Sequence, residues 1–364
     1  MTVPGPTTSG GEGGARAQSA GASAGSAGPA GSGTLVQRSR VALLRVASWI
    51  ARHVPDRAGI APADVAGGIW YRAAPARAEQ ARRNFRRVAT ELDARGTGPA
   101  PARAAARDPR ALERLVRLAF RHDARYYLEV LRVPGQTSSD FDRRVVIETP
   151  ETVDEAFVGG PVIFAAAHFG PIELPALYLA HRSGRTFVAP METVDDPPLQ
   201  GWFERTRGSL GVRIVGLRAA RRALRAELRS GGSVGIVADR DVAGGGIPVP
   251  FFGSPAPFPI GPALLAIEAD ARIYAVGVRR LGGGQVAGRL LHVPVAIEGG
   301  RRERIGATLA ALATAFEALI TDAPEQWTGA FFPIWPDLAV ERDATRGADG
   351  GDGAGGGDKP AGPG

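Results

Sequence analysis

The stretch AAAHFGPIELPA, residues 165–176, joins an apolar run to the start of a helix. The run itself, PVIFAAA at residues 161–167, has the length and content of a buried strand. Pro171 fits the first position of a helix, where its missing N–H is no loss. The pattern therefore places Glu173 in the first turn of that helix, with its side chain facing back toward His168 at the end of the strand.

His168 and Glu173 have the residue types of a general base and its orienting carboxylate. The carboxylate would fix the imidazole tautomer and stabilise the imidazolium formed when a proton is taken. Two other interpretations stay open: a surface histidine beside a carboxylate that complements the helix dipole, or a metal site completed by His181. The second lacks the i, i+4 histidine pair of zinc-protease helices, and we expect no metal.

Strand and helix patterns alternate around this stretch. Apolar runs predict strands at residues 161–166, 186–189, 212–215, 233–238, 273–278 and 290–295. Helical patterns occupy residues 171–182, 197–209, 217–230, 260–269 and 302–322. Such alternation predicts an α/β fold with a mostly parallel central sheet flanked by helices. Sites in these sheets gather at the carboxyl ends of the strands, where we expect His168.

The chain divides into four regions by composition. Helical patterns at residues 35–54, 69–88 and 112–131 precede the sheet, and residues 93–109 have the composition of a linker. We predict an N-terminal helical, membrane-associating region at 34–144 and a catalytic α/β core at 145–337. Residues 1–33 and 338–364 are rich in Gly, Ala and Pro with few bulky apolar side chains, which predicts disordered tails. The first tail also lacks the pattern of a signal peptide.

Residues 35–54 have an amphipathic pattern with several arginines and Trp49 at the flank. No uncharged run there reaches the ~20 residues needed to span a bilayer. An arginine-rich helix of this kind is typical of the membrane interface. The same pattern fits a helix that packs its apolar face on a protein core.

Composition excludes some chemistry and favours an anionic partner. The chain has no cysteine, so disulfides, thiolate nucleophiles and cysteine zinc sites are excluded. Its formal net charge is +7, and because the two predicted tails contribute zero and −2, the remaining chain carries +9. An arginine-rich body suits phosphorylated partners such as an anionic membrane surface or a nucleotide. No helix-turn-helix, RNA-recognition or zinc-finger pattern occurs, so we expect no nucleic acid.

Two further motifs have more than one interpretation. The GGSVG of residues 231–235 matches a serine nucleophile elbow, but a helix precedes it and a strand follows, which is the reverse of that motif. The VADRD of residues 237–241 ends an apolar strand in charged residues beside a glycine-rich loop, as many sites and some solvated turns do. Phe251, Phe252 and Phe258 after that loop fit either an acyl-chain groove or packing of the loop.

Three blocks in order resemble one known family. They are the H-x4-D/E motif of His168 and Glu173, residues 191–211 (METVDDPPLQGWFERTRGSLG), and residues 238–266, which begin ADRD and continue through VPFFGSPAPFPIGPALLA. Together they resemble the bacterial lysophospholipid acyltransferase-like family of lipid A and phosphatidylinositol mannoside acyltransferases. Residues 84–88 (NFRRV) and 126–135 (YYLEVLRVPG) are similar to the actinobacterial mannoside branch, although that branch commonly has Asp where this chain has Glu173.

The resemblance covers about residues 35–336 and implies an enzyme, an acyltransferase with acyl-CoA as co-substrate and no cofactor. A long fatty acyl group, typically palmitoyl, would pass to the 6-hydroxyl of a mannose on phosphatidylinositol mannosides. The protein would be peripheral, at the cytoplasmic face of the plasma membrane. His168 would be the general base and Glu173 its orienting partner. Five residues are expected to bind the substrate. Arg207 would stabilise the anionic intermediate or bind a substrate phosphate, and Glu192 would hydrogen-bond mannose hydroxyls. The acceptor pocket would be shaped by Asp239, Arg240 and Asp241.

Two alternatives accompany this interpretation. In the first, the chemistry is the same but the acceptor is a lipid A precursor or another glycolipid, with acyl carrier protein as a possible donor. In the second, the protein is a catalytically silent module that binds lipid at the membrane surface. The intact His168 and Glu173 pair argues against the silent module.

Overall fold

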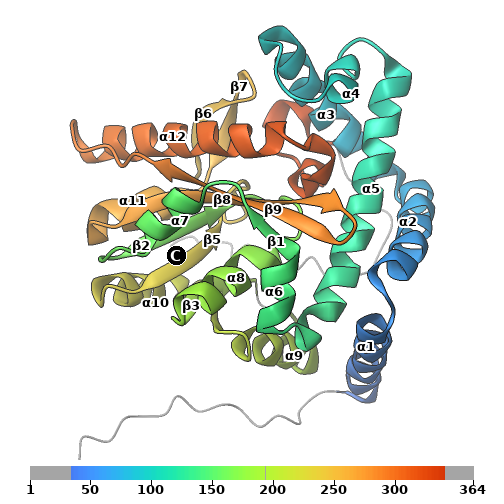
Figure 1. Ribbon diagram of the computed structural model, residues 1–364. Coiled ribbons are helices and arrows are strands. Elements are labelled where there is room, and N and C mark those ends of the chain that lie inside the picture. Colours follow the sequence, from blue (N-terminus) through green and yellow to red (C-terminus); the bar gives the residue numbers. More distant parts are fainter. Residues whose placement is uncertain (1–33, 193, 341–364) are drawn as a thin grey trace, which may run out of the picture.

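The computed structural model describes residues 34–192 and 194–340, and the tail predictions for residues 1–33 and 341–364 concern parts outside this range. A seven-stranded sheet with the order β1-β9-β8-β2-β5-β3-β4 forms the centre of the molecule (Figure 1). Its strands pair in parallel except β8 with β9. The predicted α/β class with a mostly parallel sheet is thus confirmed. The strands are β1 (Val145–Ile147), β2 (Val162–Ala166), β3 (Phe187–Met191), β4 (Val212–Gly216), β5 (Ser233–Val237), β8 (Arg272–Gly282) and β9 (Gln285–Val293).

Strand β2 is buried on both faces, which explains its unbroken apolar sequence. Because side chains alternate along a strand, Ile163 and Ala165 enter one core and Phe164 and Ala166 enter another. The first core contains side chains of α10 (Leu217–Arg229), α11 (Gly261–Ala269) and α12 (Arg301–Thr321), and the second contains those of α7 (Pro150–Ala156) and α8 (Glu173–Ser183). The sheet is therefore covered on both sides around β2.

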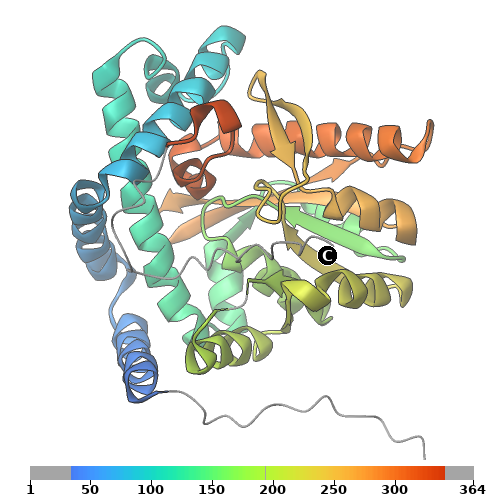
Figure 2. The ribbon, with the colours of Figure 1, turned by 180° about the vertical axis from the view of Figure 1, so that it is seen from behind.

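The N-terminal helices form a layer at one end of the sheet. Figures 1 and 2 both show α5 crossing that end, with α1 and α2 on its outer side. The helices are α1 (Leu35–His53), α2 (Asp56–Ala73), α3 (Pro75–Arg95), α4 (Ala100–Ala104), α5 (Pro109–Arg132) and α6 (Ser138–Arg144), and α9 (Pro197–Gly208) lies later in the chain. The expected helix at residues 69–88 is thus two helices, and the expected linker contains α4.

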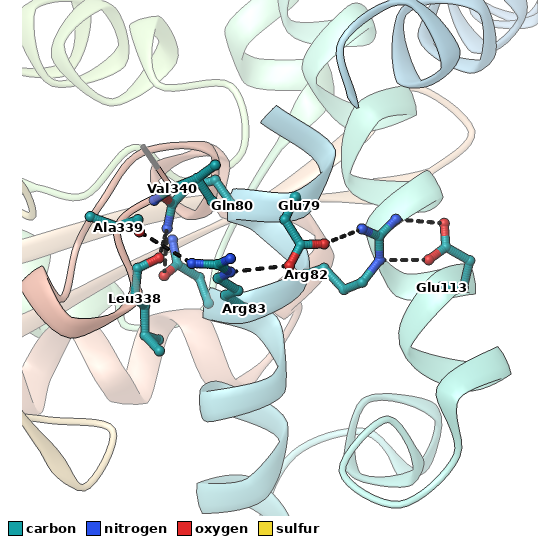
Figure 3. Close-up of polar contacts among 9 residues, drawn as sticks. Glu79, Gln80, Arg82, Arg83, Glu113, Leu338, Ala339 and Val340 are labelled. Atoms are coloured by element: carbon teal, nitrogen blue, oxygen red, sulfur yellow. Dashed lines mark hydrogen bonds and ion pairs between the residues drawn. The ribbon is translucent and has the colours of Figure 1, made fainter. Parts of the chain in front are cut away.

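The last described residues bind to α3. The Gln80 side chain donates to the Leu338 carbonyl over 3.1 Å and accepts from the Val340 N–H over 2.9 Å (Figure 3). Arg83 donates to the Ala339 carbonyl over 3.2 Å. The predicted tail from residue 338 onward therefore begins with three residues that are hydrogen-bonded to the body. On the other side of α3, Arg82 joins Glu113 of α5 (Figure 3).

Two features lie outside the sequence expectations. An antiparallel hairpin of β6 (Ile247–Phe251) and β7 (Ser254–Phe258) follows β5. Within the described ranges, α12 is the one helix long and apolar enough to cross a membrane by length and composition. Half of the apolar stretch of this helix is buried inside the protein, and its Leu309, Leu312 and Phe316 are fully buried. In this structure α12 is therefore a core helix.

Candidate active site

Neighbouring strands place His168 beside Asp239. Strands β2 and β5 pair in parallel with Ala166 opposite Val237. Each chain runs two residues further to reach His168 and Asp239, and the Ala238 N–H still donates to the Ala166 carbonyl over 2.9 Å. Both side chains therefore emerge at the same carboxyl edge of the sheet, which is the usual place for a site in this class of fold.

Asp239 accepts three hydrogen bonds. Its Oδ1 lies 2.6 Å from Nδ1 of His168, and its Oδ2 accepts from the His168 backbone N–H over 3.0 Å and from Nε1 of Trp327 over 2.8 Å. The Asp239 side chain is fully buried, whereas the imidazole is 29% exposed. One buried carboxylate thus fixes the ring of His168 and leaves part of it open to a substrate.

The charge state of this pair follows from its contacts. Burial alone would raise the pKa of Asp239, but the adjacent His168 and the hydrogen bonds from His168 and Trp327 lower that pKa below its ordinary value. Asp239 is therefore ionised and can only accept, so Nδ1 of His168 carries the proton. In the neutral ring Nε2 then carries the lone pair, and this tautomer is the form of imidazole that takes a proton from a hydroxyl.

The backbone after His168 is held by the segment that carries Trp327. The His168 carbonyl accepts from the Thr328 N–H over 2.8 Å, and the Gly170 N–H donates to the Gln326 carbonyl over 2.9 Å. Gly170 has φ +61°, and a Cβ there would overlap the Val278 carbonyl oxygen. A glycine is required at this position for both reasons.

Glu173 has a different role from the one expected. Helix α8 begins at Glu173 rather than at Pro171. The Glu173 carboxylate accepts from Nε of Arg207 over 2.8 Å, from a second Arg207 nitrogen, and from the Tyr126 hydroxyl over 3.4 Å. Across the described residues none of its hydrogen bonds reaches His168. The prediction that Glu173 orients the imidazole is corrected: Asp239 does so, because β5 places its carboxylate beside Nδ1.

Arg207 and Glu173 form a two-pronged ion pair, with side chains 15% and 17% exposed. Burial acts to lower the pKa of Arg207, but the charge and hydrogen bonds of Glu173 raise it above its ordinary value. Burial and the nearby Glu173 raise the pKa of Tyr126 well above its ordinary value, so the phenol stays protonated. Arg207 is thus a permanently charged group that is bonded to Glu173, the first residue of α8. Glu173 follows His168 by five residues in the chain.

The other expected site residues lie in separate places. Glu192 is exposed directly after β3, and no hydrogen bond to it occurs in the part of the chain that the structure describes. The Arg240 guanidinium carbon lies 3.4 Å from the centre of the Phe332 ring. Asp241 accepts from the Gly246 N–H over 2.7 Å and so organises the glycine-rich loop. Of the expected substrate residues, the structure therefore brings Asp239 to His168 and Arg207 to Glu173.

Helix α5 carries buried and half-buried charged residues that sequence reasoning missed. Asp123 is buried, and desolvation raises its pKa to about 6 against the lowering effect of Arg77, Arg280 and His168. Glu129 pairs with Arg280 through two hydrogen bonds of 2.9 and 2.6 Å. The available signal was the run RHDARYY at 121–127, where charged residues fall on the face that the helix buries.

Two open alternatives are resolved by packing. His181, which the alternative metal interpretation required as a third ligand, lies 3.6 Å from Asp142 and stacks on Phe141, two residues of α6. Three phenylalanines follow the glycine-rich loop, and all three rings are buried: Phe251, Phe252 and Phe258. Phe251 and Phe252 pack on each other and on the buried tryptophans Trp327 and Trp335, which is core packing rather than a groove.

Comparison with known proteins places the chain among acyltransferases. A 31% identity over 235 residues links the chain to "Phosphatidylinositol mannoside acyltransferase" of Mycobacterium tuberculosis strain H37Rv, covering 62% of this chain and 69% of the relative. The protein of the same name from Mycolicibacterium smegmatis is 28% identical over 308 residues, covering 83% of this chain and 93% of the relative. The profile described as "Bacterial lipid A biosynthesis acyltransferase" matches residues 104–329, which include both His168 and Asp239. The chain belongs to this bacterial lipid A biosynthesis acyltransferase family.

Proposed function

We propose that this acyltransferase moves a long fatty acyl group, palmitoyl in the first instance, from acyl-CoA to the 6-hydroxyl of a mannose on phosphatidylinositol mannosides. The observation that carries the proposal is the hydrogen bond between Nδ1 of His168 and the buried Asp239. The names of two mycobacterial relatives support the acceptor. No metal, cofactor or cysteine is required for such a transfer.

The chemistry needs one base and an activated acyl donor. Nε2 of His168 takes the proton of the mannose hydroxyl as its oxygen attacks the thioester carbonyl, and the ionised Asp239 stabilises the imidazolium that forms. The tetrahedral intermediate then collapses: the C–S bond breaks, CoA thiolate leaves, and the imidazolium can return the proton to it. A new ester bond has replaced the thioester.

Arg207 is our candidate for stabilising the negative oxygen of that intermediate. Its two-pronged bond to Glu173 fixes the guanidinium plane near the start of α8. In this account Glu173 positions Arg207, and Asp239 positions His168. The two carboxylates of the site thus position two different side chains.

The outer face of α1 and α2 supports a peripheral membrane location. Eight large apolar side chains on these two helices are exposed: Leu35, Val36, Leu43, Val46, Trp49, Ile50, Val65 and Ile69. Exposed apolar side chains alternate along α1 with arginines such as Arg38 and Arg45. Such a helix lies in the interface of a membrane with its arginines near anionic headgroups. We place the enzyme at the cytoplasmic face, where acyl-CoA is available.

A lipid A precursor is a second candidate acceptor, because the family profile carries that description. The test is transfer of label from radioactive palmitoyl-CoA to phosphatidylinositol mono- and dimannosides by purified protein. A lipid A precursor and the His168→Ala variant are assayed in parallel. The proposal is supported if the wild-type protein forms product on the mannosides and the His168→Ala variant does not. If product forms only on the lipid A precursor, the acceptor is that precursor rather than the mannosides. Transfer by the His168→Ala variant at the wild-type rate would refute the claim that His168 is the general base.

A further inference from the structure

A short segment after α12, residues 324–331, packs against the chain at His168 (red in Figure 1). The Thr328 N–H and the Thr328 hydroxyl both donate to the His168 carbonyl, over 2.8 and 3.1 Å. Gln326 is buried, and its side-chain amide accepts from the Arg280 N–H over 2.8 Å and donates to the Arg280 carbonyl over 3.0 Å. The segment is therefore fixed both to the chain that follows β2 and to β8.

Trp327 lies within this segment and reaches the carboxylate that orients the base. Its Nε1 donates to Oδ2 of Asp239 over 2.8 Å, and the whole side chain is buried. The same Oδ2 accepts from the His168 backbone N–H over 3.0 Å, while Oδ1 lies 2.6 Å from Nδ1 of the His168 ring. The indole is therefore one of two donors on the oxygen that does not face the ring, and it helps to fix the plane of the carboxylate.

Gly329 leaves the space that this hydrogen bond needs. A Cβ at residue 329 would overlap Nε1 of Trp327 and Oδ2 of Asp239, the two atoms that the bond joins. The φ of Gly329 is outside the left-handed region, so its backbone alone would admit alanine. The close approach of the indole to the carboxylate thus accounts for the glycine.

The indole also acts on the charge of the pair formed by Asp239 and His168. Burial alone would raise the pKa of Asp239, but His168 and the hydrogen bond from Trp327 lower it below its ordinary value. A donor to the ionised carboxylate stabilises the state in which Asp239 is charged and His168 is neutral, and this state takes a proton from a hydroxyl. Removal of the donor would therefore raise the pH at which the pair takes up a proton.

Other charged groups surround the pair, and none of them is altered when the indole N–H is removed. Asp123 of α5 interacts electrostatically with His168. Glu325 lies two residues before Trp327, and burial raises its pKa. Arg240 and Asp241 are the next residues in the chain after the carboxylate. A titration that shifts only on loss of the indole N–H is therefore a property of residue 327.

We propose that Trp327 is a positioning residue of this enzyme, which holds the Asp239 carboxylate in the orientation that keeps His168 ready to take a proton. The inference rests on the proposed function, in which His168 is the base of the transfer reaction. Trp327 acts through Asp239 and is itself buried away from the substrate. Its role is distinct from that of the other tryptophans because its indole donates to the carboxylate of the base.

Three changes to the full-length chain interrupt this bond. Trp327→Phe removes the N–H together with part of the ring. Site-specific incorporation of 3-benzothienylalanine at position 327 keeps the shape of tryptophan but has sulfur in place of the N–H. Gly329→Ala forces apart the two atoms that the bond joins. The matched control is Trp335→Phe, because Trp335 is also buried and packs on the same Phe251 ring, but its Nε1 donates to the Ser254 carbonyl.

Two measurements separate positioning from general damage to the fold. The first is the pH dependence of kcat for palmitoyl transfer, with KM for acyl-CoA. The second needs no turnover: an NMR titration of the His168 ring, assigned by its absence from His168→Ala, gives the midpoint pH of the pair. Thermal unfolding of each variant is measured in parallel. Gly306→Ala is the control for Gly329→Ala, because nothing lies within 4 Å of the Cβ position of Gly306.

Loss of one hydrogen bond to the buried carboxylate predicts a kcat lower by about tenfold, with KM for acyl-CoA little changed. The acidic limb of the pH profile and the midpoint of the His168 titration should both move to higher pH, by about one unit. We expect neither shift for Trp335→Phe or Gly306→Ala.

The inference is wrong if the protein with 3-benzothienylalanine at position 327 keeps the wild-type titration of His168. It is equally wrong if, in an active enzyme, that titration shifts while kcat stays at the wild-type value. An inactive wild-type protein whose His168 titration still depends on the indole N–H would overturn the proposed function and keep the positioning role of Trp327.

Discussion

The Asp239 carboxylate holds His168 through two hydrogen bonds, one to Nδ1 of the ring and one to the backbone N–H of the same residue. This double attachment fixes the position of the strand end and the orientation of the ring together. The Trp327 indole supplies a third donor to the carboxylate and closes it off from water. A preorganised base of this kind needs little rearrangement when the proton is transferred.

The Glu173 and Arg207 pair predicts strongly non-additive substitutions. We expect Glu173→Gln and Arg207→Gln each to lower kcat, because each removes or misplaces the same guanidinium. The double variant should then raise the activation free energy of transfer by less than the sum of the two single variants, with an interaction free energy of about 1–3 kcal/mol. The measurement is a double-mutant cycle on the transfer rate, with the exposed Arg205→Gln on α9 as control. Additive effects would show that the two residues act independently.

Asp123→Asn should stabilise the folded protein at neutral pH. Because the folded-state pKa of Asp123 is raised from 3.8 to about 6, ionising it costs folding free energy. That cost is absent below about pH 4, develops between pH 4 and 6, and is fully present above pH 6. We expect Asp123→Asn to raise the free energy of unfolding by about 1–3 kcal/mol at pH 8. Urea titrations at pH 8 and pH 4 measure this, and an equal gain at both pH values would contradict it.

Gly170→Ala should damage both fold and activity. The new Cβ would overlap the Val278 carbonyl oxygen and force a positive φ on alanine. Gly184→Ala is the matched control, since Gly184 also has positive φ but nothing lies within 4 Å of its Cβ position. We expect a cost of about 1–2 kcal/mol for the control and at least about twice that for Gly170→Ala. Equal thermal unfolding of the two variants would refute the steric argument.

Much of the sheet could be predicted from sequence because its central strands are short apolar runs. The sequence predicts both β2 and β5, and also the charged VADRD segment that follows β5. The hairpin of β6 and β7 was missed because prolines alternate along both strands, IPVPF and SPAPF, which reads as loop. Strand β9 was predicted too late because Gly288 and Arg289 interrupt its apolar pattern.

The correct partner of His168 was beyond sequence reasoning. Glu173 is five residues away in the chain, whereas Asp239 is 71 residues away and becomes a neighbour only because β2 pairs with β5. Strand order is a long-range property that the spacing of residues in one motif does not contain. The same holds for α5, whose sequence predicts a helix but not that it crosses the carboxyl ends of the strands (Figure 1).

Membrane binding should depend on the outer face of α1. We expect Leu43→Glu with Val46→Glu to weaken co-sedimentation with anionic vesicles by about tenfold or more, since each exposed apolar side chain that enters the interface contributes on the order of 1 kcal/mol. Val158→Glu with Ile297→Glu is the control, because both of these residues are exposed away from α1. Equal weakening by the control pair would place the membrane face elsewhere.

The most direct test of the account is the single-turnover rate of palmitoyl transfer to phosphatidylinositol mannoside by Asp239→Asn, beside wild type. An amide at residue 239 cannot stabilise the imidazolium of His168 and favours the wrong ring tautomer. We predict a rate lower by about 10²–10⁴-fold, with KM for acyl-CoA and thermal unfolding little changed. A folded Asp239→Asn enzyme that transfers palmitoyl at the wild-type rate would contradict the claim that Asp239 and His168 form the catalytic base.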